Sequence, residues 1–325
     1  MGLDSFLEVE KPLEKLEEKI EELRRLNAQG TVDLADEIRL LEEKALRLKE
    51  EIFKSLSAWE KVQLARHMKR PTTLDYVRAI TTDFVELHGD RLFADDPALV
   101  GGFARFEGIP VMVIGHQKGK ETKENVYRNF GMASPEGFRK AARLMKLTEK
   151  FKHPLITFID TPGAYPGIEA EERGQFVAIA ENLTLMAGLS VPIVVCIIGE
   201  GGSGGALALG LGDRVIMLEH SVYSVISPEG CASILWRDGK KAPEASSFLH
   251  LTAQDLEKLR LVDEVIPEPL GGAHRNIEMT IQRVRKSISN HLSQVSALSL
   301  PELLRLRYQK YRKMGVVLEF PEVRR

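Results

Sequence analysis

The chain has 325 residues, 28% of them charged and 43% hydrophobic, and a formal net charge of −2 at pH 7. This length can bury a full hydrophobic core, and the near-neutral charge gives no case for binding nucleic acid. Cys196 and Cys231 lack Cys or His neighbours at zinc-ligand spacing, so we expect neither a disulfide framework nor a metal in this chain. Short apolar stretches and an acidic N-terminus argue against a membrane span and a signal peptide, which predicts a soluble cytoplasmic protein.

Residues 11–66 predict two amphipathic helices joined by a turn at residues 27–30. Leu and Ile recur at steps of three and four residues among Glu, Lys and Arg, the period of a helix with one apolar face. Asp33 or Thr31 is expected to cap the second helix. The pair is interpreted either as a hairpin docked on the rest of the chain or as one that packs against a partner subunit. Residues 1–69 are assigned to this hairpin and a linker.

Strands and helices alternate from about residue 70. Three segments start with proline, continue as an apolar β-branched run and end in glycine, namely residues 110–115, 154–163 and 192–199. Helices are expected between them, at about 135–151 and 170–188, and short strands after them, at 214–218 and 221–226. This order is typical of parallel strands with crossover helices, hence an α/β fold. The spacing fits either a doubly wound sheet or a spiral of β–β–α turns, and residues 70–275 are assigned to this core.

Residues 276–325 are assigned to a C-terminal helical region, with a helical pattern over residues 276–313. Its end carries five basic residues and no acid among them, namely Arg305, Arg307, Lys310, Arg312 and Lys313. We expect either a solvated basic helix or a patch that faces phosphate groups or another subunit.

The most informative segment is Gly199–Gly205, called the glycine turn below, where an apolar strand enters a helical pattern through five glycines, Glu200 and Ser203. Backbone without side chains can approach a ligand closely, and free N–H groups at a helix start suit an anion or a developing oxyanion. The turn matches G-x-G-x-x-G, but that dinucleotide fingerprint belongs to the first strand–helix unit of its fold, and two such units precede it here. Asp160–Gly163 matches the D-x-x-G of GTPases, yet the chain has no phosphate-binding G-x-x-x-x-G-K-[ST] upstream.

A serine hydrolase is an alternative interpretation of the same turn. Residues 201–205 match G-x-S-x-G, and Asp263 and His274 follow Ser203 in the order of a hydrolase triad. The excess of glycine instead favours a site in which backbone, rather than the Ser203 hydroxyl, faces the reaction. Asp160–Gly163 then forms a second strand-end turn at the same sheet edge, with Tyr165 on a pocket wall. Lys118, in a basic loop, is expected either to contact phosphate or carboxylate there or to be solvated.

Nine segments together resemble the family of α subunits of bacterial acetyl-CoA carboxylase carboxyltransferases. The resemblance covers about residues 5–315 and rests on these motifs in order: Ala65-Arg-His67 with Arg70-Pro71, His88-Gly-Asp-Arg91, Gly115-His-Gln-Lys-Gly119, Asn129-Phe-Gly-Met132, Asp160-Thr-Pro-Gly-Ala-Tyr-Pro-Gly167, Glu171-Glu-Arg-Gly174, Gly199-Glu-Gly-Gly-Ser-Gly-Gly-Ala206, Tyr223-Ser-Val-Ile-Ser-Pro-Glu-Gly-Cys231 and Pro267-Glu-Pro-Leu-Gly-Gly-Ala-His274.

The resemblance implies a crotonase-type fold, a β–β–α superhelix. It implies transfer of a carboxyl group from carboxybiotin on a carrier protein to acetyl-CoA, giving malonyl-CoA, the first committed step of fatty acid synthesis. It also implies partners: a homologous β subunit that bears a zinc ribbon and shares the active site in an α₂β₂ heterotetramer, biotin carboxylase and the biotin carboxyl carrier protein.

The resemblance places the oxyanion site for biotin at the backbone of Gly204 and Gly205, with Ala206 as another donor, and leaves the enolate site mainly to the partner. The residues expected to bind substrate are Gly163, Ala164, Tyr165, Gly201, Gly202 and Lys118. A non-catalytic scaffold subunit remains a further alternative, motivated by the hairpin and the basic C-terminal helix.

Overall fold

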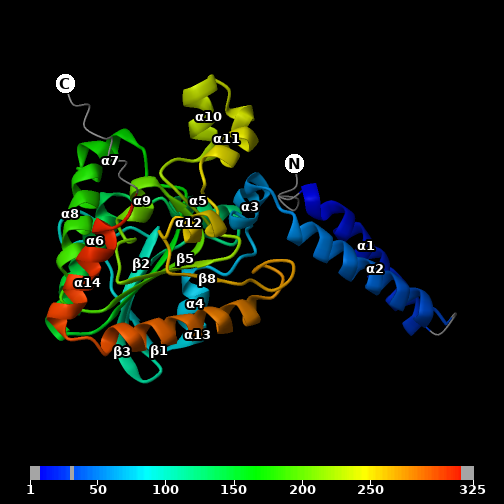
Figure 1. Cartoon of the computed structure of the whole chain (residues 1–325), viewed down its shortest axis with the longest axis horizontal. Helices are drawn as coiled ribbons and strands as arrows, with labels where there is room; N and C mark the ends of the chain where they lie inside the picture. Colours follow the sequence, from blue (N-terminus) through cyan, green and yellow to red (C-terminus); the bar gives the residue numbers. More distant parts are fainter. Residues whose placement is uncertain (1–7, 30–32, 316–325) are drawn as a thin grey trace, which may run out of the picture.

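The computed structural model describes residues 8–29 and 33–315, and one eight-stranded sheet forms its centre (Figure 1). The sheet order is β1-β2-β3-β4-β5-β6-β8, with β7 beside β5; β1 to β3 pair antiparallel and the other pairs are parallel. The strands are β1 (Thr81–Glu86), β2 (Leu99–Phe106), β3 (Ile109–His116), β4 (Leu155–Thr161), β5 (Ile193–Gly202), β6 (Arg214–Leu218), β7 (Val222–Ser224) and β8 (Glu264–Ile266). The strand expected at 221–226 is thus only three residues long.

Strand β5 changes partner along its length. Val194–Ile197 pair with β6, whereas Glu200–Gly202 pair with β7. The sheet therefore turns away from a single plane where β5 ends, as a spiral of strands requires. The glycine turn begins at this change of partner.

Both faces of the sheet are covered, which explains the continuous apolar runs. Along β5 the side chains of Ile193, Val195 and Ile197 enter one core, while the alternate side chains enter the other. The first core lies under α6 (Pro135–Phe151), α8 (Gln175–Gly188), α9 (Ser203–Leu207) and α12 (Ala253–Lys258). The second lies under α4 (Thr73–Ile80) and α13 (Ile277–Ser296).

Short helices complete the core domain: α3 (Ala58–Ala65), α5 (Thr122–Tyr127), α7 (Ile168–Glu172), and 3₁₀ turns at Glu8–Glu10, Asn129–Gly131 and Gly239–Lys241. The single helix expected at 170–188 is wrong, because α7 and α8 are separate. Gly174 lies between them with φ +82°, a left-handed conformation that interrupts a right-handed helix.

The N-terminal hairpin of α1 (Lys11–Ala28) and α2 (Ala35–Lys54) projects from the sheet domain (Figure 1). Its apolar side chains pack on one another and form a separate small core. At its base, Arg275 donates to Glu10 at 2.9 Å and to Glu17 at 2.7 Å. Asp33 accepts from the Ala35 N–H at 3.1 Å near the start of α2, whereas Thr31 lies outside the described residues.

The C-terminal basic cluster is not simply solvated, which corrects one of the two expectations for it. Arg307, on α14 (Leu300–Arg312), is 2% exposed and pairs with Asp213 at 2.8 Å. Lys310 pairs with Asp263. Asp213 directly precedes β6 and Asp263 directly precedes β8, so these two pairs dock α14 at the starts of these strands. Both charges are neutralised there, and only part of the cluster faces outward.

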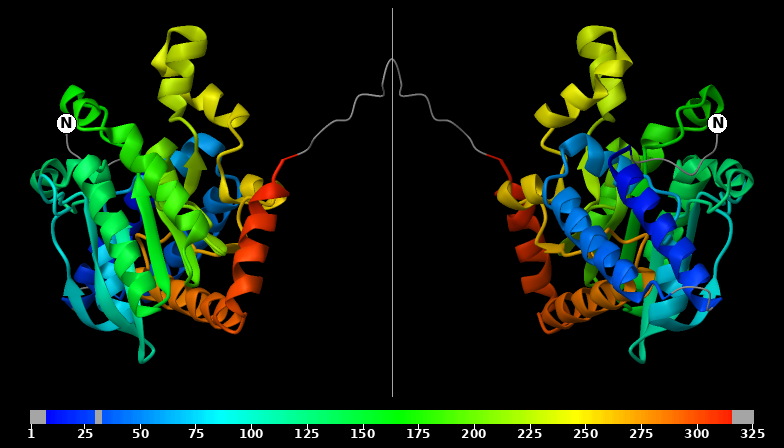
Figure 2. Two further views of the ribbon diagram at one scale, coloured as in Figure 1. Left: turned by 90° about the vertical axis from the view of Figure 1, so that its left-hand side faces the viewer. Right: turned by 90° about the vertical axis from the view of Figure 1, so that its right-hand side faces the viewer.

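Helices α10 (Pro228–Trp236) and α11 (Ala242–Phe248) form a projection, called the arm below, that rises above the sheet edge where β5 ends (Figure 2). The arm meets the body through α11, which packs on α3. Within the described residues, no helix is both long and apolar enough to cross a membrane.

Candidate active site at two strand-end turns

The glycine turn packs against a second turn, Thr161–Tyr165, at the end of β4. This second turn is called the proline turn below. A side chain on Gly202 would collide with the Pro162 carbonyl, and one on Gly205 would meet the Ala164 nitrogen at 2.5 Å. The two turns are in register, because Thr161 pairs with Gly201 across β4 and β5. The absence of side chains is therefore needed first for packing of backbone against backbone.

Gly204 differs from its neighbours. A methyl group there would meet only Ile179, at 3.5 Å, which is ordinary contact. Gly204 is partly exposed, whereas Gly205 and Ala206 are buried. The first N–H groups of α9 have no partner within the helix. Of the three expected donors, Gly204 is the one whose surroundings leave room for a ligand.

The structure brings the expected site residues Gly163, Ala164, Gly201 and Gly202 to this edge. Tyr165 lies there too, partly buried, with its hydroxyl donating to Glu169 at 2.8 Å. The roles of these residues in binding substrate stay predictions.

Lys118 also lies at this edge, but its ammonium group is already paired. Its Nζ is 2.8 Å from both Asp160 Oδ1 and Glu200 Oε2, and its side chain is 17% exposed. Burial alone would lower the pKa of Lys118, but the Asp160 and Glu200 charges outweigh it and the pKa rises. A group that contacts Lys118 therefore meets a cation together with two carboxylates.

The pairing continues to Arg66, at the end of α3. Its Nε donates to Glu200 Oε1 at 2.6 Å, and its Nη1 donates to Glu229 Oε1, on α10, at 2.5 Å. Burial lowers the pKa of the Arg66 guanidinium, but the two carboxylates outweigh it and raise the pKa above its ordinary value. The Asp160–Lys118–Glu200–Arg66–Glu229 chain, called the ion network below, thus joins three strand ends to the arm.

Sequence reasoning did not select Arg66, Asp160, Glu200 or Glu229 as site residues, although each lies in a segment singled out as a motif. A signal was available for two of them. Asp160 and Glu200 directly follow apolar strand runs, and a buried carboxylate needs a partner.

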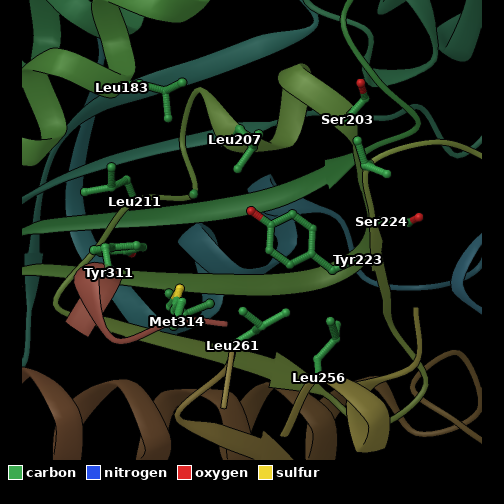
Figure 3. A pocket seen from close by; sticks show the side chains of 13 residues that line it. Leu183, Ser203, Leu207, Leu211, Tyr223, Ser224, Leu256, Leu261, Tyr311 and Met314 are labelled. Atoms are coloured by element: carbon green, nitrogen blue, oxygen red, sulfur yellow. The ribbon is translucent and has the colours of Figure 1, made fainter. Parts of the chain in front are cut away.

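Two cavities flank the turns. One, of about 540 Å³, has a polar wall and includes Arg66, Lys118, Asn125, Phe130, Asp160 and Pro162 in its lining. The other, of about 340 Å³, is almost entirely apolar (Figure 3). Ser203 and Leu207 lie at its rim, and Tyr223, Leu261 and Met314 line it.

The proposed hydrolase triad is not assembled. Asp263 accepts from the Val215 N–H at 2.6 Å and pairs with Lys310. His274 stacks on His67 at the base of the hairpin, with ring centroids 4.0 Å apart. Ser203 does have φ +51°, the left-handed backbone typical of a nucleophile elbow, but neither triad partner has contacts that place it beside the hydroxyl.

Glu10, His67 and His274 form a cluster whose possible ligand atoms all lie within 4.8 Å of one another. Two existing hydrogen bonds compete with a metal ion there. Arg275 donates to Glu10, and the Lys69 N–H donates to His67 Nδ1 at 3.2 Å, which leaves the proton of neutral His67 on Nε2. The donor set fits an anchor for the hairpin better than a cation site.

A family model described as acetyl co-enzyme A carboxylase carboxyltransferase-like matches residues 6–315. The chain belongs to this family. It is 60% identical over 309 residues to the acetyl-coenzyme A carboxylase carboxyl transferase subunit alpha of Geobacter metallireducens, covering 95% of this chain and 97% of the relative. It is 58% identical over 314 residues to the subunit of the same name from Photobacterium profundum, covering 96% and 98%.

The solved structures that resemble the chain show its fold. Transcarboxylase 12S matches with a TM-score of 0.58 at 20% identity, over 74% of this chain and 45% of that chain, so this chain spans less than half of the 12S chain. A Pseudomonas malonate decarboxylase hetero-tetramer in complex with coenzyme A matches with a TM-score of 0.54 at 18% identity, over 67% and 89%. These neighbours confirm the crotonase-type fold and decide against a doubly wound sheet. Family membership confirms the resemblance found in the motifs and makes the chain a carboxyltransferase subunit.

Proposed function

We propose that the chain acts as the α subunit of an acetyl-CoA carboxylase carboxyltransferase and carries the biotin side of the active site at the glycine turn. The observation that supports this assignment is the pairing of family membership with an accessible Gly204 backbone, at a sheet edge where two strand-end turns meet. The reaction is transfer of a carboxyl group from carboxybiotin to acetyl-CoA, giving malonyl-CoA for fatty acid synthesis.

Carboxybiotin supplies the carboxyl group, and its ureido oxygen becomes negative as that group leaves. In the proposal, the Gly204 N–H donates to this oxygen, with Gly205 behind it and Ala206 as the more buried option. A backbone donor is preorganised and has no pKa to tune, and loss of one such donor in other enzymes costs about 3 kcal/mol. Residues Gly163, Ala164, Tyr165, Gly201 and Gly202 would form the adjoining wall, with Lys118 at its base.

A partner subunit is expected at this edge, because large apolar side chains are exposed around it. They come from α7, α8, α9, the residue after β7 and the arm, and include Ile168, Phe176, Leu207, Val225, Ile234, Leu235 and Phe248. Apolar side chains gathered on one face mark association surfaces. We propose that the partner is the zinc-ribbon β subunit in an α₂β₂ assembly, served by biotin carboxylase and a biotin carboxyl carrier protein.

The test is biotin-dependent carboxyl transfer, followed as malonyl-CoA decarboxylation with free biocytin. The chain alone is compared with the chain mixed with a candidate β subunit, after co-elution has been shown. Activity only in the mixture supports the shared site. Transfer by the β subunit alone would favour the scaffold alternative. An inactive co-eluting complex would contradict the proposal, and labelling of Ser203 by a fluorophosphonate would favour the hydrolase.

A further inference from the structure

Arg66 connects parts of the molecule that are remote in sequence. It forms ion pairs with Glu200, 134 residues away on β5, and with Glu229, 163 residues away on the arm. Its contact with Glu229 uses two nitrogens, Nη1 at 2.5 Å and Nη2 at 3.3 Å. A forked guanidinium of this kind fixes direction as well as distance, which a lysine ammonium cannot do.

The Glu200 end of this connection lies within the glycine turn. Glu200 is 7% exposed, it is followed directly by Gly201 and Gly202, and its own N–H donates to Asp160 Oδ1 at 3.0 Å. Lys118 holds the same two carboxylates from the end of β3. Any displacement of the Glu200 side chain is therefore transmitted to the ends of β4 and β5.

The Glu229 end is tied to the arm. Glu229 lies in the first turn of α10, whose start is capped by the Ser227 hydroxyl accepting from the Gly230 N–H at 3.1 Å. Arg66, Gly202, Ser227 and Pro228 line one narrow crevice between the arm and the two turns. The arm projects from the body (Figure 1), and besides the packing of α11 on α3, the Arg66–Glu229 pair links the start of α10 to this edge.

We propose that Arg66 is a positioning residue for carboxyl transfer, which holds the arm at a set distance from the glycine turn. This inference rests on the proposed function, because the glycine turn matters only if it takes part in the reaction. Arg66 acts through Glu200 and Glu229 and is not assigned a contact with the reacting atoms. A misplacement of catalytic groups by about 1 Å can lower the rate about 100-fold. Loss of the contacts of Arg66 with Glu200 and Glu229 should therefore be measurable in kcat.

The test uses the reconstituted complex and the biocytin assay. Wild-type activity is measured first, and an inactive wild type would contradict the proposed function. Only with an active wild type do the variants test the role of Arg66. Arg66→Met keeps an aliphatic side chain and removes the guanidinium group. Glu229→Gln removes the charge on the arm and leaves the Arg66–Glu200 ion pair in place. We expect each variant to lower kcat about tenfold or more while KM for malonyl-CoA changes less than about twofold. Arg66→Lys should rescue little, because one ammonium group cannot reproduce the contact of Nε with Glu200 together with the contacts of Nη1 and Nη2 with Glu229.

A double-mutant cycle separates positioning from general loss of stability. If Arg66 and Glu229 act only through their contact with each other, the double variant Arg66→Met/Glu229→Gln has the same kcat as Arg66→Met alone. Arg275→Met is the matched control, since Arg275 also bridges two glutamates with 19% side-chain exposure, against 27% for Arg66, but at the hairpin base. It should lower the unfolding midpoint and leave kcat within about twofold. An unchanged kcat in Arg66→Met, or effects that multiply in the double variant, would overturn the proposal.

Discussion

Gly205 lies so close to Ala164 that a methyl group on Gly205 would come within 2.5 Å of the Ala164 backbone nitrogen. The relationship separates two roles that glycine plays in one turn. Gly205 allows the glycine turn to pack on the proline turn, whereas a methyl group on Gly204, one residue earlier, would meet only Ile179 at an ordinary contact distance. Substitutions at the two positions should therefore fail for different reasons.

Gly204→Ala tests the oxyanion assignment without disturbing the fold. The added methyl meets only Ile179 and φ at this position is not left-handed, so we expect an unfolding midpoint within about 1 °C of wild type. Carboxyl transfer should fall at least about tenfold, because the methyl fills space next to the proposed donor. Gly188→Ala, with nothing within 4 Å and also no left-handed φ, is the control that should keep full activity. Normal transfer by Gly204→Ala would contradict the assignment.

Gly205→Val should abolish transfer together with a clear loss of stability. A valine that only blocked access of biotin would leave the complex assembled. The structure gives another reason, since the side chain would strike the backbone of Gly163 and Ala164. Denaturation and transfer measured on the same preparation distinguish the two, because a blocked but intact site would unfold at the wild-type midpoint.

We predict that the Ser203 hydroxyl is not needed as a nucleophile, and that the Ser203 side chain lowers the stability of the fold. Ser203→Ala should lower transfer less than about tenfold, whereas loss of an essential nucleophile is on the order of 10⁴-fold or more. Because Ser203 has φ +51°, Ser203→Gly should stabilise the fold by about 1 kcal/mol. Urea denaturation of the two variants checks this order; a glycine variant less stable than the alanine variant would show that the left-handed backbone at residue 203 is not a source of strain.

The buried pair of Arg70 and Glu268 should govern acid stability. Both side chains are at most 4% exposed and their ion pair is 2.7 Å long. Burial raises the pKa of Glu268, but the Arg70 charge and hydrogen bonds outweigh it and lower the pKa to about 2. Stability from this depressed pKa is present above about pH 4.5 and is lost as the pH falls towards 2. Glu268→Gln should cost about 3 kcal/mol or more at pH 7.

The gap in unfolding free energy between wild type and Glu268→Gln should therefore narrow steadily below pH 4.5. Denaturation at pH 7, 4 and 3 measures it. A gap that stays constant with pH would show that the cost is one of packing and not of charge. Glu107→Gln, whose carboxylate makes a 37%-exposed pair with Arg285, is the control and should show only a small effect at every pH.

His67 should add a second, milder acid transition. Burial and the neighbouring His274 ring lower the pKa of His67 to about 4. A histidine held neutral in this way contributes stability that is complete above its unfolded value of 6.5 and is lost as the pH falls through 4. His67→Gln should flatten the pH dependence of stability between pH 6.5 and 4. If the variant keeps the wild-type slope, other groups cause the pH dependence.

The sequence alone was enough to predict the elements whose apolar period is strong and the family to which they belong. The unbroken apolar run Ile193–Ile198 predicts a buried strand, and β5, with a core on each face of the sheet, confirms this. The glycines after it predict a turn in which backbone replaces side chains, and the hairpin is visible in its leucine spacing. These features are local, because each depends on residues within about ten positions of one another.

Only the tertiary structure decided which charges meet. The sequence predicted that Lys118 either contacts phosphate or carboxylate groups or is solvated, whereas in the structure it is paired with Asp160 and Glu200, 42 and 82 residues further along. The sequence predicted that Arg307 belongs to a basic surface, whereas in the structure it is buried and paired with Asp213. Likewise, nothing in the spacing of Gly204 and Gly205 shows that one faces solvent and the other faces Ala164. Such pairings depend on how distant strands and helices are brought together, because an ion pair has no sequence period of its own.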